Sequence, residues 1–190
     1  MWPWEHLAFG YVLYSGYTRL RHGRRPERGP VVALVVATQL PDLIDKPLAW
    51  TFDVLPTGRS LGHSVFVAGA FLGVVALLAR RRGAPAFGPA VAVGYLSHLL
   101  GDVIYHVVTQ VLRGEATAVE DVAFLLWPLV RQPSRETGRL LERTDQLFGE
   151  FVTYLGTPDG LVYLALELGL LLLATVFWAS DGWPGLSMDR

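Results

Sequence analysis

Among the histidines and acids of the first 102 residues, six are candidate metal ligands: His6, Asp42, Asp45, His63, His98 and Asp102. Imidazole and carboxylate groups bind divalent cations, and such a cation makes water acidic enough to attack an ester near neutral pH. Ionisable groups are costly within a membrane, so several acids along apolar helices need a partner. The set therefore predicts a metal centre with hydrolytic chemistry.

The spacing of His98 and Asp102 is the clearest local signal. They are four residues apart in GYLSHLLGD, so on a helix they share one face and can bind the same ion. The alternative is a hydrogen bond between two buried polar groups. His6 could instead be an aromatic residue at the membrane interface. His63 could instead have a structural role at the start of a helix that Ser64 caps.

Asp42 and Asp45 are three residues apart in QLPDLIDKP. Pro41 removes a backbone hydrogen bond, which predicts a kink or break in the helix where the carboxylates begin. The alternative is an exposed helix end, where Asp45 pairs with Lys46 or Arg59 in an ion pair that contributes little.

The composition indicates a membrane protein. The chain has 190 residues, of which 52% are apolar and 17% charged, and its net charge is −1. Its basic residues are clustered in sequence and do not form one nucleic-acid-binding face, so DNA and RNA are not expected as partners. Because there is no cysteine, any metal must bind nitrogen and oxygen. The N-terminus lacks the features of a cleaved secretory signal, so we expect it to be retained.

Five apolar segments predict an all-α membrane bundle of about five transmembrane helices. Residues 160–179 are the clearest span, with a single acid. Gly, Pro or polar residues interrupt the others, which are residues 2–20, 30–49, 63–79 and 86–108. Such interruptions suit helices that pack on one another. A soluble, fully buried bundle would also explain these four segments, but not the last.

Arginines orient these helices. They follow the first and third segments, as Arg19, Arg21, Arg24, Arg25 and Arg28, and as Arg80, Arg81 and Arg82. Short loops rich in arginine stay in the cytoplasm. We therefore expect a multi-pass cell-membrane protein whose six candidate ligands all lie toward the extracytoplasmic side.

We expect one domain over residues 1–190, with a metal-ligand core in 1–108, an extracytoplasmic connector in 109–158 and a final transmembrane helix in 159–180. From Ser134, a plausible N-cap after Pro133, apolar residues recur at helical spacing: Leu140, Leu141, Leu147, Phe148, Phe151, Val152 and Leu155. This pattern predicts an amphipathic helix on the membrane surface. The alternative is a helix that packs on the bundle without a functional role.

The ligand types favour zinc, with manganese or iron as alternatives, and six ligands suit one ion with supporting carboxylates or two ions. Asp42 or Asp45 is the candidate to accept a proton from water. Arg59 is a candidate for holding an anionic substrate, or else anchors the third helix at the interface. A site at the outer membrane face favours membrane lipid, or a lipid-linked or amphiphilic substrate.

Several short motifs, in order, resemble the YdjM/YbcI-like membrane-bound metal-dependent hydrolases. They are His6, Pro41-Asp42 with Asp45, His63-Ser64, Ser97-His98-x-x-x-Asp102 and Leu126-Trp127-Pro128. That family is similar in ligand order to zinc-dependent phospholipase C. The resemblance implies metal-dependent hydrolysis of a phosphoester. Before His63, Arg59-Ser60-Leu61-Gly62 only approximates the family pattern. His106 shares the helical face of His98 outside the motif, as an additional ligand, a proton donor or an interfacial histidine.

Two other classes of function compete with a hydrolase. Inward-facing acids and histidines also occur in cation or proton transporters and channels. Such a pathway needs polar residues at several depths, whereas Val74 to Leu78 and Phe87 to Val93 contain none. The third class is a membrane protein that a metal stabilises structurally, which predicts a closed coordination sphere.

Overall fold

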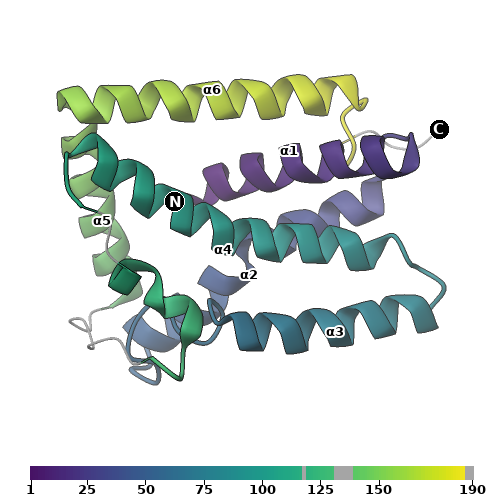
Figure 1. Ribbon diagram of the computed structural model, residues 1–190, viewed down its shortest axis with the longest axis horizontal. Coiled ribbons are helices and arrows are strands. Elements are labelled where there is room, and N and C mark those ends of the chain that lie inside the picture. Colours follow the sequence, from purple (N-terminus) through teal and green to yellow (C-terminus); the bar gives the residue numbers. More distant parts are fainter. Residues whose placement is uncertain (117–118, 131–138, 187–190) are drawn as a thin grey trace. The chain divides into compact units, whose positions relative to one another are not determined.

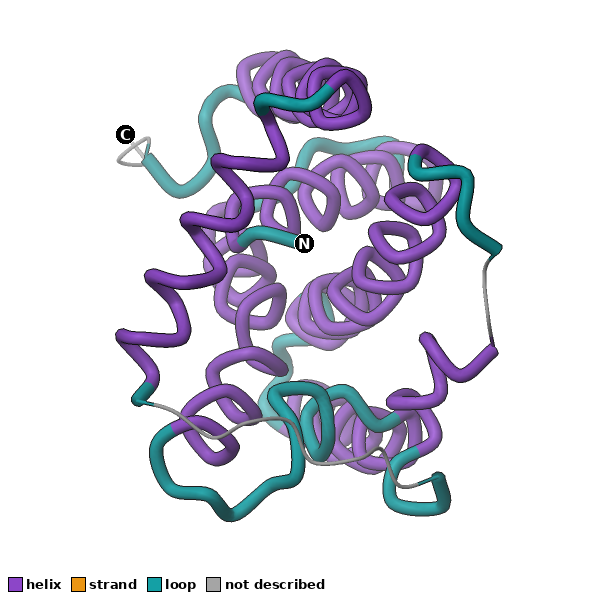
Figure 2. Tube along the Cα trace, turned by 90° about the vertical axis from the view of Figure 1, so that its left-hand side faces the viewer, coloured by secondary structure: helices purple, strands orange, loops and turns teal. Residues whose placement is uncertain are grey.

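The computed structural model describes residues 1–116, 119–130 and 139–186. These residues form helices and loops and contain no strand (Figure 2). The helices are α1 (Pro3–His22), α2 (Arg28–Trp50), α3 (Val65–Arg81), α4 (Phe87–Leu112), the 3-10 helix η1 (Val119–Leu126), α5 (Leu140–Leu155) and α6 (Pro158–Ser180) (Figure 1). The expected all-α class is confirmed.

Two of the described helices are long and apolar enough to cross a membrane. They are α4, with 26 residues, and α6, with 23 residues. A helix rises 1.5 Å per residue, so about 20 residues cross a hydrocarbon core of about 30 Å. Both helices correspond to segments that the sequence predicts to be transmembrane.

The expectation of about five transmembrane helices is not supported. Among the described helices, α1, α2 and α3 do not qualify as spans by length and composition. Asp42, Asp45 and Lys46 interrupt the apolar part of α2, and α3 has only 17 residues. The apolar runs of the sequence therefore led us to overestimate the number of transmembrane helices, because these runs do not show where each helix begins and ends.

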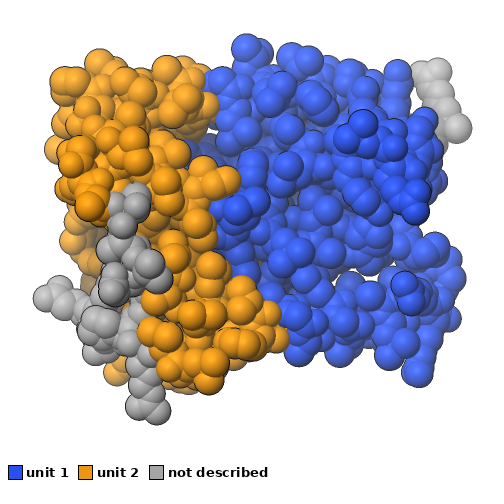
Figure 3. Space-filling model, in the orientation of Figure 1, with its two compact units in different colours: residues 1–40, 68–101, 169–190 blue, residues 41–67, 102–168 orange. Residues whose placement is uncertain are grey.

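The chain separates into two compact units (Figure 3). Unit 1 contains residues 1–40, 68–101 and 169–190, and unit 2 contains residues 41–67 and 102–168. The helices α2, α3, α4 and α6 each contribute residues to both units. Each unit is described separately below.

Unit 1 has a core of aromatic and aliphatic side chains from α1, α2 and α4. Its buried members are Tyr11, Tyr14, Val31, Leu34 and Ala90. These helices approach closely at Gly10, where an added Cβ would lie 2.6 Å from Cγ2 of Thr38 and 2.8 Å from Oγ of Ser97. Only glycine fits this contact without displacing neighbouring atoms, so Gly10 sets the packing of α1 in this unit.

A buried carboxylate joins α1 to the end of α6 in unit 1. Asp181 accepts hydrogen bonds from the hydroxyls of Tyr11, at 2.7 Å, and Ser15, at 2.6 Å. The guanidinium of Arg19 donates two more to its Oδ1 atom. Several donors compensate for burying this charge, so the first and last described helices of the chain are held together.

In unit 2, α2 continues through Pro41 to Trp50, so the predicted helix break at Pro41 is wrong. A proline removes one backbone donor, and the neighbouring turns of a long helix still hold it together. The loop after α2 returns to this position. A Cβ on Gly62 would lie 2.8 Å from the carbonyl oxygen of Pro41, so only glycine lets the loop approach α2 this closely.

The expected amphipathic helix is present as α5, which has no buried residue. It begins at Leu140, whereas the expected N-cap Ser134 and Pro133 lie outside the described residues. Its aromatic side chains Phe151 and Tyr154 contact the ring of Tyr163 in α6, with centroids 6.2 and 6.0 Å apart. The end of α5 therefore packs on the beginning of α6.

Candidate functional site

The carboxylate of Asp45 organises the loop that carries His63 in unit 2. It accepts hydrogen bonds from the backbone N–H groups of Ser60, Gly62 and His63, at 2.7, 2.7 and 3.2 Å. The Nδ1 atom of His63 donates a fourth, at 2.8 Å. Both side chains are completely buried. Because a carboxylate only accepts, Nδ1 must carry the proton, and Nε2 is the ring atom that can coordinate.

Two further carboxylates face this Nε2 atom. Oδ1 of Asp42 lies 3.6 Å from it and Oδ2 of Asp102 lies 3.5 Å from it. Two atoms bound tetrahedrally to zinc at about 2.0–2.2 Å lie about 3.4 Å from one another. Asp42 and Asp102 therefore each have the donor type of a zinc ligand and lie at about that separation from Nε2 of His63, with Asp45 in the supporting position.

The charge state of His63 follows from the same carboxylates. Burial by itself lowers the pKa of His63, but hydrogen bonds to Asp102 and Asp45 and the nearby charge of Asp42 raise it more. The net pKa is above its usual value. The same carboxylates that favour a proton on this ring favour a metal cation beside it.

The residues around His63 fix where α3 begins. Oγ of Ser64 accepts the backbone N–H of Val67, at 3.4 Å, as the N-cap of this helix. The same hydroxyl donates to the carbonyl oxygen of Trp127, at 2.6 Å. The motif residues His63-Ser64 and Leu126-Trp127-Pro128, far apart in sequence, thus meet in unit 2. His63 lies in the loop before α3 and not in its first turn.

Two basic side chains pair with the carboxylates that face His63. Nζ of Lys46 lies 2.5 Å from Oδ2 of Asp42, and Nε of Arg59 lies 2.8 Å from Oδ2 of Asp102. The alternative of an exposed pair between Asp45 and Lys46 or Arg59 is therefore wrong. Asp45 is buried by the loop that folds over it, and the basic residues pair with its neighbours.

His106 lies beside Arg59 in unit 2. Nη1 of Arg59 is 2.6 Å from Nε2 of His106, and the Arg59 guanidinium lies over the ring of Phe124, 5.5 Å from its centroid. Because a guanidinium only donates, Nε2 of His106 accepts this hydrogen bond. In this arrangement His106 positions Arg59, and its Nε2 atom is not directed to a metal.

The two remaining candidates, His6 and His98, are together in unit 1. Their rings stack with centroids 3.7 Å apart, and both side chains are completely buried. Nδ1 of His98 lies 2.7 Å from the carbonyl oxygen of Thr38. A carbonyl only accepts, so this bond places the proton on Nδ1, and Nε2 can coordinate, as in His63.

Of the six predicted ligands, four lie in unit 2, where Asp42, Asp45 and Asp102 each approach the ring of His63, and two lie in unit 1, where His6 stacks on His98. The helix α4 runs unbroken through His98 and Asp102, which share one of its faces.

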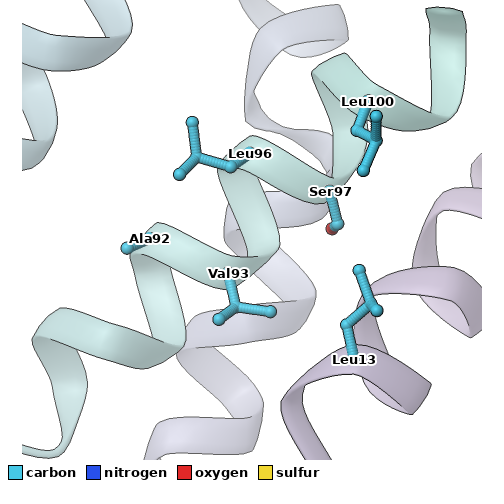
Figure 4. A pocket seen from close by; sticks show the side chains of 6 residues that line it. All are labelled: Leu13, Ala92, Val93, Leu96, Ser97 and Leu100. Carbon is cyan, nitrogen blue, oxygen red and sulfur yellow. The ribbon is translucent and has the colours of Figure 1, made fainter. Parts of the chain in front are cut away.

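An apolar cavity of about 250 Å³ lies between α1 and α4 in unit 1. Its lining comprises Leu13, Ala92, Val93, Leu96, Ser97 and Leu100. Ser97 and Leu13 point toward one another across it (Figure 4). The cavity adjoins the turn of α4 that carries His98.

The chain matches a known protein family over nearly its whole length. A family model described as YdjM inner membrane protein matches residues 1–183. The chain belongs to the YdjM inner membrane protein family. Family membership and the two apolar helices together indicate a membrane protein. No curated protein and no solved structure matched the chain. The similarity to zinc-dependent phospholipase C therefore stays a prediction.

Sequence reasoning did not identify two residues that shape this region. The sequence suggested Lys46 only as an ion-pair partner of Asp45 and gave Phe124 no role in the site. Lys46 is the fourth residue after Asp42, a spacing that places them on one helical face and could have revealed the pair. Phe124, which is 1% exposed and 5.9 Å from the His63 ring, had no comparable signal.

Proposed function

We propose that this YdjM family protein is a membrane-embedded, metal-dependent hydrolase that cleaves a phosphoester of a lipid-linked or amphiphilic substrate. The observation that carries the proposal is the approach of Asp42 and Asp102 to Nε2 of His63, with Asp45 on the opposite ring nitrogen. Carboxylate support behind a metal-binding histidine is a recurrent feature of zinc sites.

In this proposal Asp42, His63 and Asp102 hold the metal, preferably zinc, with manganese or iron as alternatives. A divalent metal supplies Lewis acidity, which polarises a phosphoryl oxygen and acidifies water. His6 and His98, whose rings stack on one another in unit 1, are the other two predicted ligands.

The two candidate proton acceptors have different surroundings. Asp45 has no exposed surface and its carboxylate accepts four hydrogen bonds, so it positions His63. The side chain of Asp42 is 12% exposed, and its Oδ2 atom pairs with the flexible ammonium group of Lys46. We therefore assign proton transfer from the attacking water to Oδ2 of Asp42. Arg59 binds the substrate phosphate.

Family membership and the cavity of unit 1 support the proposed substrate class. The chain is an inner membrane family protein, and the cavity beside His98 is lined mostly by apolar side chains. Both features favour a substrate that carries an apolar chain as well as a phosphoester. The arginine clusters at residues 19–28 and 80–82 favour a multi-pass topology with the site on the extracytoplasmic side.

Metal analysis of the purified protein tests the proposal. The wild type should retain zinc at a constant ratio, and Asp42→Asn should lose most of it. Asp53→Asn, which changes an exposed acid in the same unit, should retain it. The wild type and the control should release product from phosphodiester or phosphomonoester lipids, and Asp42→Asn should not.

Each outcome separates the alternatives. If the wild type binds no metal even when metal is supplied, the central claim fails. If it binds zinc stoichiometrically, hydrolyses no member of the lipid panel and melts at a lower temperature after chelation, a structural metal explains the site better.

A further inference from the structure

Lys46 is the only lysine of the chain and lies in unit 2. It lies one turn after Asp42 on α2, with Nζ 2.5 Å from Oδ2 of that residue. Its ammonium group is 5.8 Å from the centroid of Trp50, whose indole packs on Gly58. The side chain is 31% exposed, so its charged end reaches solvent beside the proposed metal ligands.

Arg59 pairs with Asp102 as Lys46 pairs with Asp42. Its Nε atom donates to Asp102, its Nη1 atom to His106, and its guanidinium lies over Phe124. This side chain is 27% exposed. Lys46 and Arg59 are thus each tied to one of the two carboxylates that face Nε2 of His63.

The charges explain why these two residues are paired as they are. Asp42, Asp45 and Asp102 bring three negative charges close to one imidazole, and Lys46 and Arg59 offset two of them. A divalent cation held by Asp42 and Asp102 takes over this neutralisation. The ammonium and guanidinium groups then keep all their donors, next to the metal and open to solvent.

A phosphoryl group is the ligand that matches this arrangement. Its several oxygens accept hydrogen bonds from both a guanidinium and an ammonium group, and its charge matches theirs. A carboxylic ester or an amide is neutral and has no such complement of acceptors.

We propose that Lys46 and Arg59 form a phosphate clamp, in which both residues turn from Asp42 and Asp102 to bind the phosphoryl oxygens of the substrate once a metal is present. The clamp rests on the proposed function and assigns its specificity for phosphoesters to Lys46 as well as Arg59. It also frees Oδ2 of Asp42 to accept a proton.

Zinc binding and phosphate binding by a Lys46→Met variant test the clamp. Methionine keeps an unbranched apolar side chain next to Trp50 but has no charge. Calorimetric titration with zinc should give an affinity equal to the wild type or up to about tenfold tighter, because a competing cation is gone. Titration of the zinc-loaded protein with inorganic phosphate should give an affinity lower by about ten- to a hundredfold.

Two further variants act as controls. Lys46→Arg keeps the charge and should keep phosphate affinity within about threefold of the wild type. Arg82→Met removes an exposed positive charge in unit 1 and should leave both affinities unchanged. Weaker phosphate binding with a zinc affinity that is unchanged or tighter, in Lys46→Met alone, is the signature of the clamp.

The contrary results are distinguishable. A zinc-loaded wild type that binds no phosphate, or binds it as weakly as Lys46→Met, overturns the clamp and leaves the metal site standing. Loss of zinc affinity in Lys46→Met also overturns the clamp, since Lys46 then only supports the ligands. A wild type that binds no metal overturns the proposed function and the clamp with it.

Discussion

His63 donates its Nδ1 proton to Asp45 at 2.8 Å, within a loop that the same carboxylate holds through three backbone N–H groups. This contact sets both the position of the imidazole and the ring atom that remains for coordination. Asp45 therefore acts through His63, and the loss of its charge has two separable consequences.

Asp45→Asn should weaken zinc binding by about ten- to a hundredfold, because an amide does not hold the Nδ1 proton as firmly as a carboxylate. It should also lower the free energy of unfolding by about 1–3 kcal/mol, since a buried acceptor of several hydrogen bonds is altered. Zinc titration and thermal unfolding measure the two effects. Asp53→Asn, at an exposed position, is the matched control and should change neither quantity.

His98→Ala tests the prediction from the sequence that His98 is a metal ligand. The Nδ1 atom of His98 is bonded to the Thr38 carbonyl, which directs Nε2 to the role of ligand. We expect zinc affinity to fall by more than about tenfold, as it does when metal sites lose supporting residues. His22→Ala removes an exposed histidine of α1 and should have no effect. Equal zinc affinity in all three proteins would show that the unit 2 residues bind the metal without His98.

Gly10→Ala should destabilise unit 1, because its Cβ would lie 2.6 Å from Cγ2 of Thr38 and 2.8 Å from Oγ of Ser97. We expect a loss of about 1–2 kcal/mol, in which overpacking exceeds the gain in helix propensity. Gly16→Ala in the same helix has no neighbour within 4 Å and should be stabilising by up to about 1 kcal/mol. Melting temperatures of the two variants should therefore shift in opposite directions. Equal shifts would contradict the close approach at Gly10.

Single cysteines test the proposed topology, because the chain contains none of its own. With an impermeant thiol reagent on intact cells, Arg21→Cys should stay unlabelled and Asp53→Cys should react. Both positions are exposed, so each should react after the membrane is opened. Labelling of Arg21→Cys from outside would reverse the orientation and place the site on the cytoplasmic side.

The membrane segments show where sequence patterns succeed and fail. The long apolar runs predicted α4 and α6, since length and composition are enough to define a candidate span. The same reasoning overestimated how many of the other helices span the membrane. The predicted span 30–49, which lies in α2, includes Asp42, Asp45 and Lys46. Their charges are inconsistent with a lipid-facing span but suit a polar site.

In the candidate site, too, the sequence determines some relationships and the tertiary structure decides others. Residue types and spacing determined that His98 and Asp102 share a helical face and that Asp42 lies near a proline, because helical periodicity depends only on sequence separation. Which side chain pairs with which depends on tertiary contacts across many residues. Only the folded loop of residues 51–64 brings His63 to Asp45, and only the packing of unit 2 joins Arg59 to Asp102. Buried charges must find partners, and the fold decides which partners are within reach.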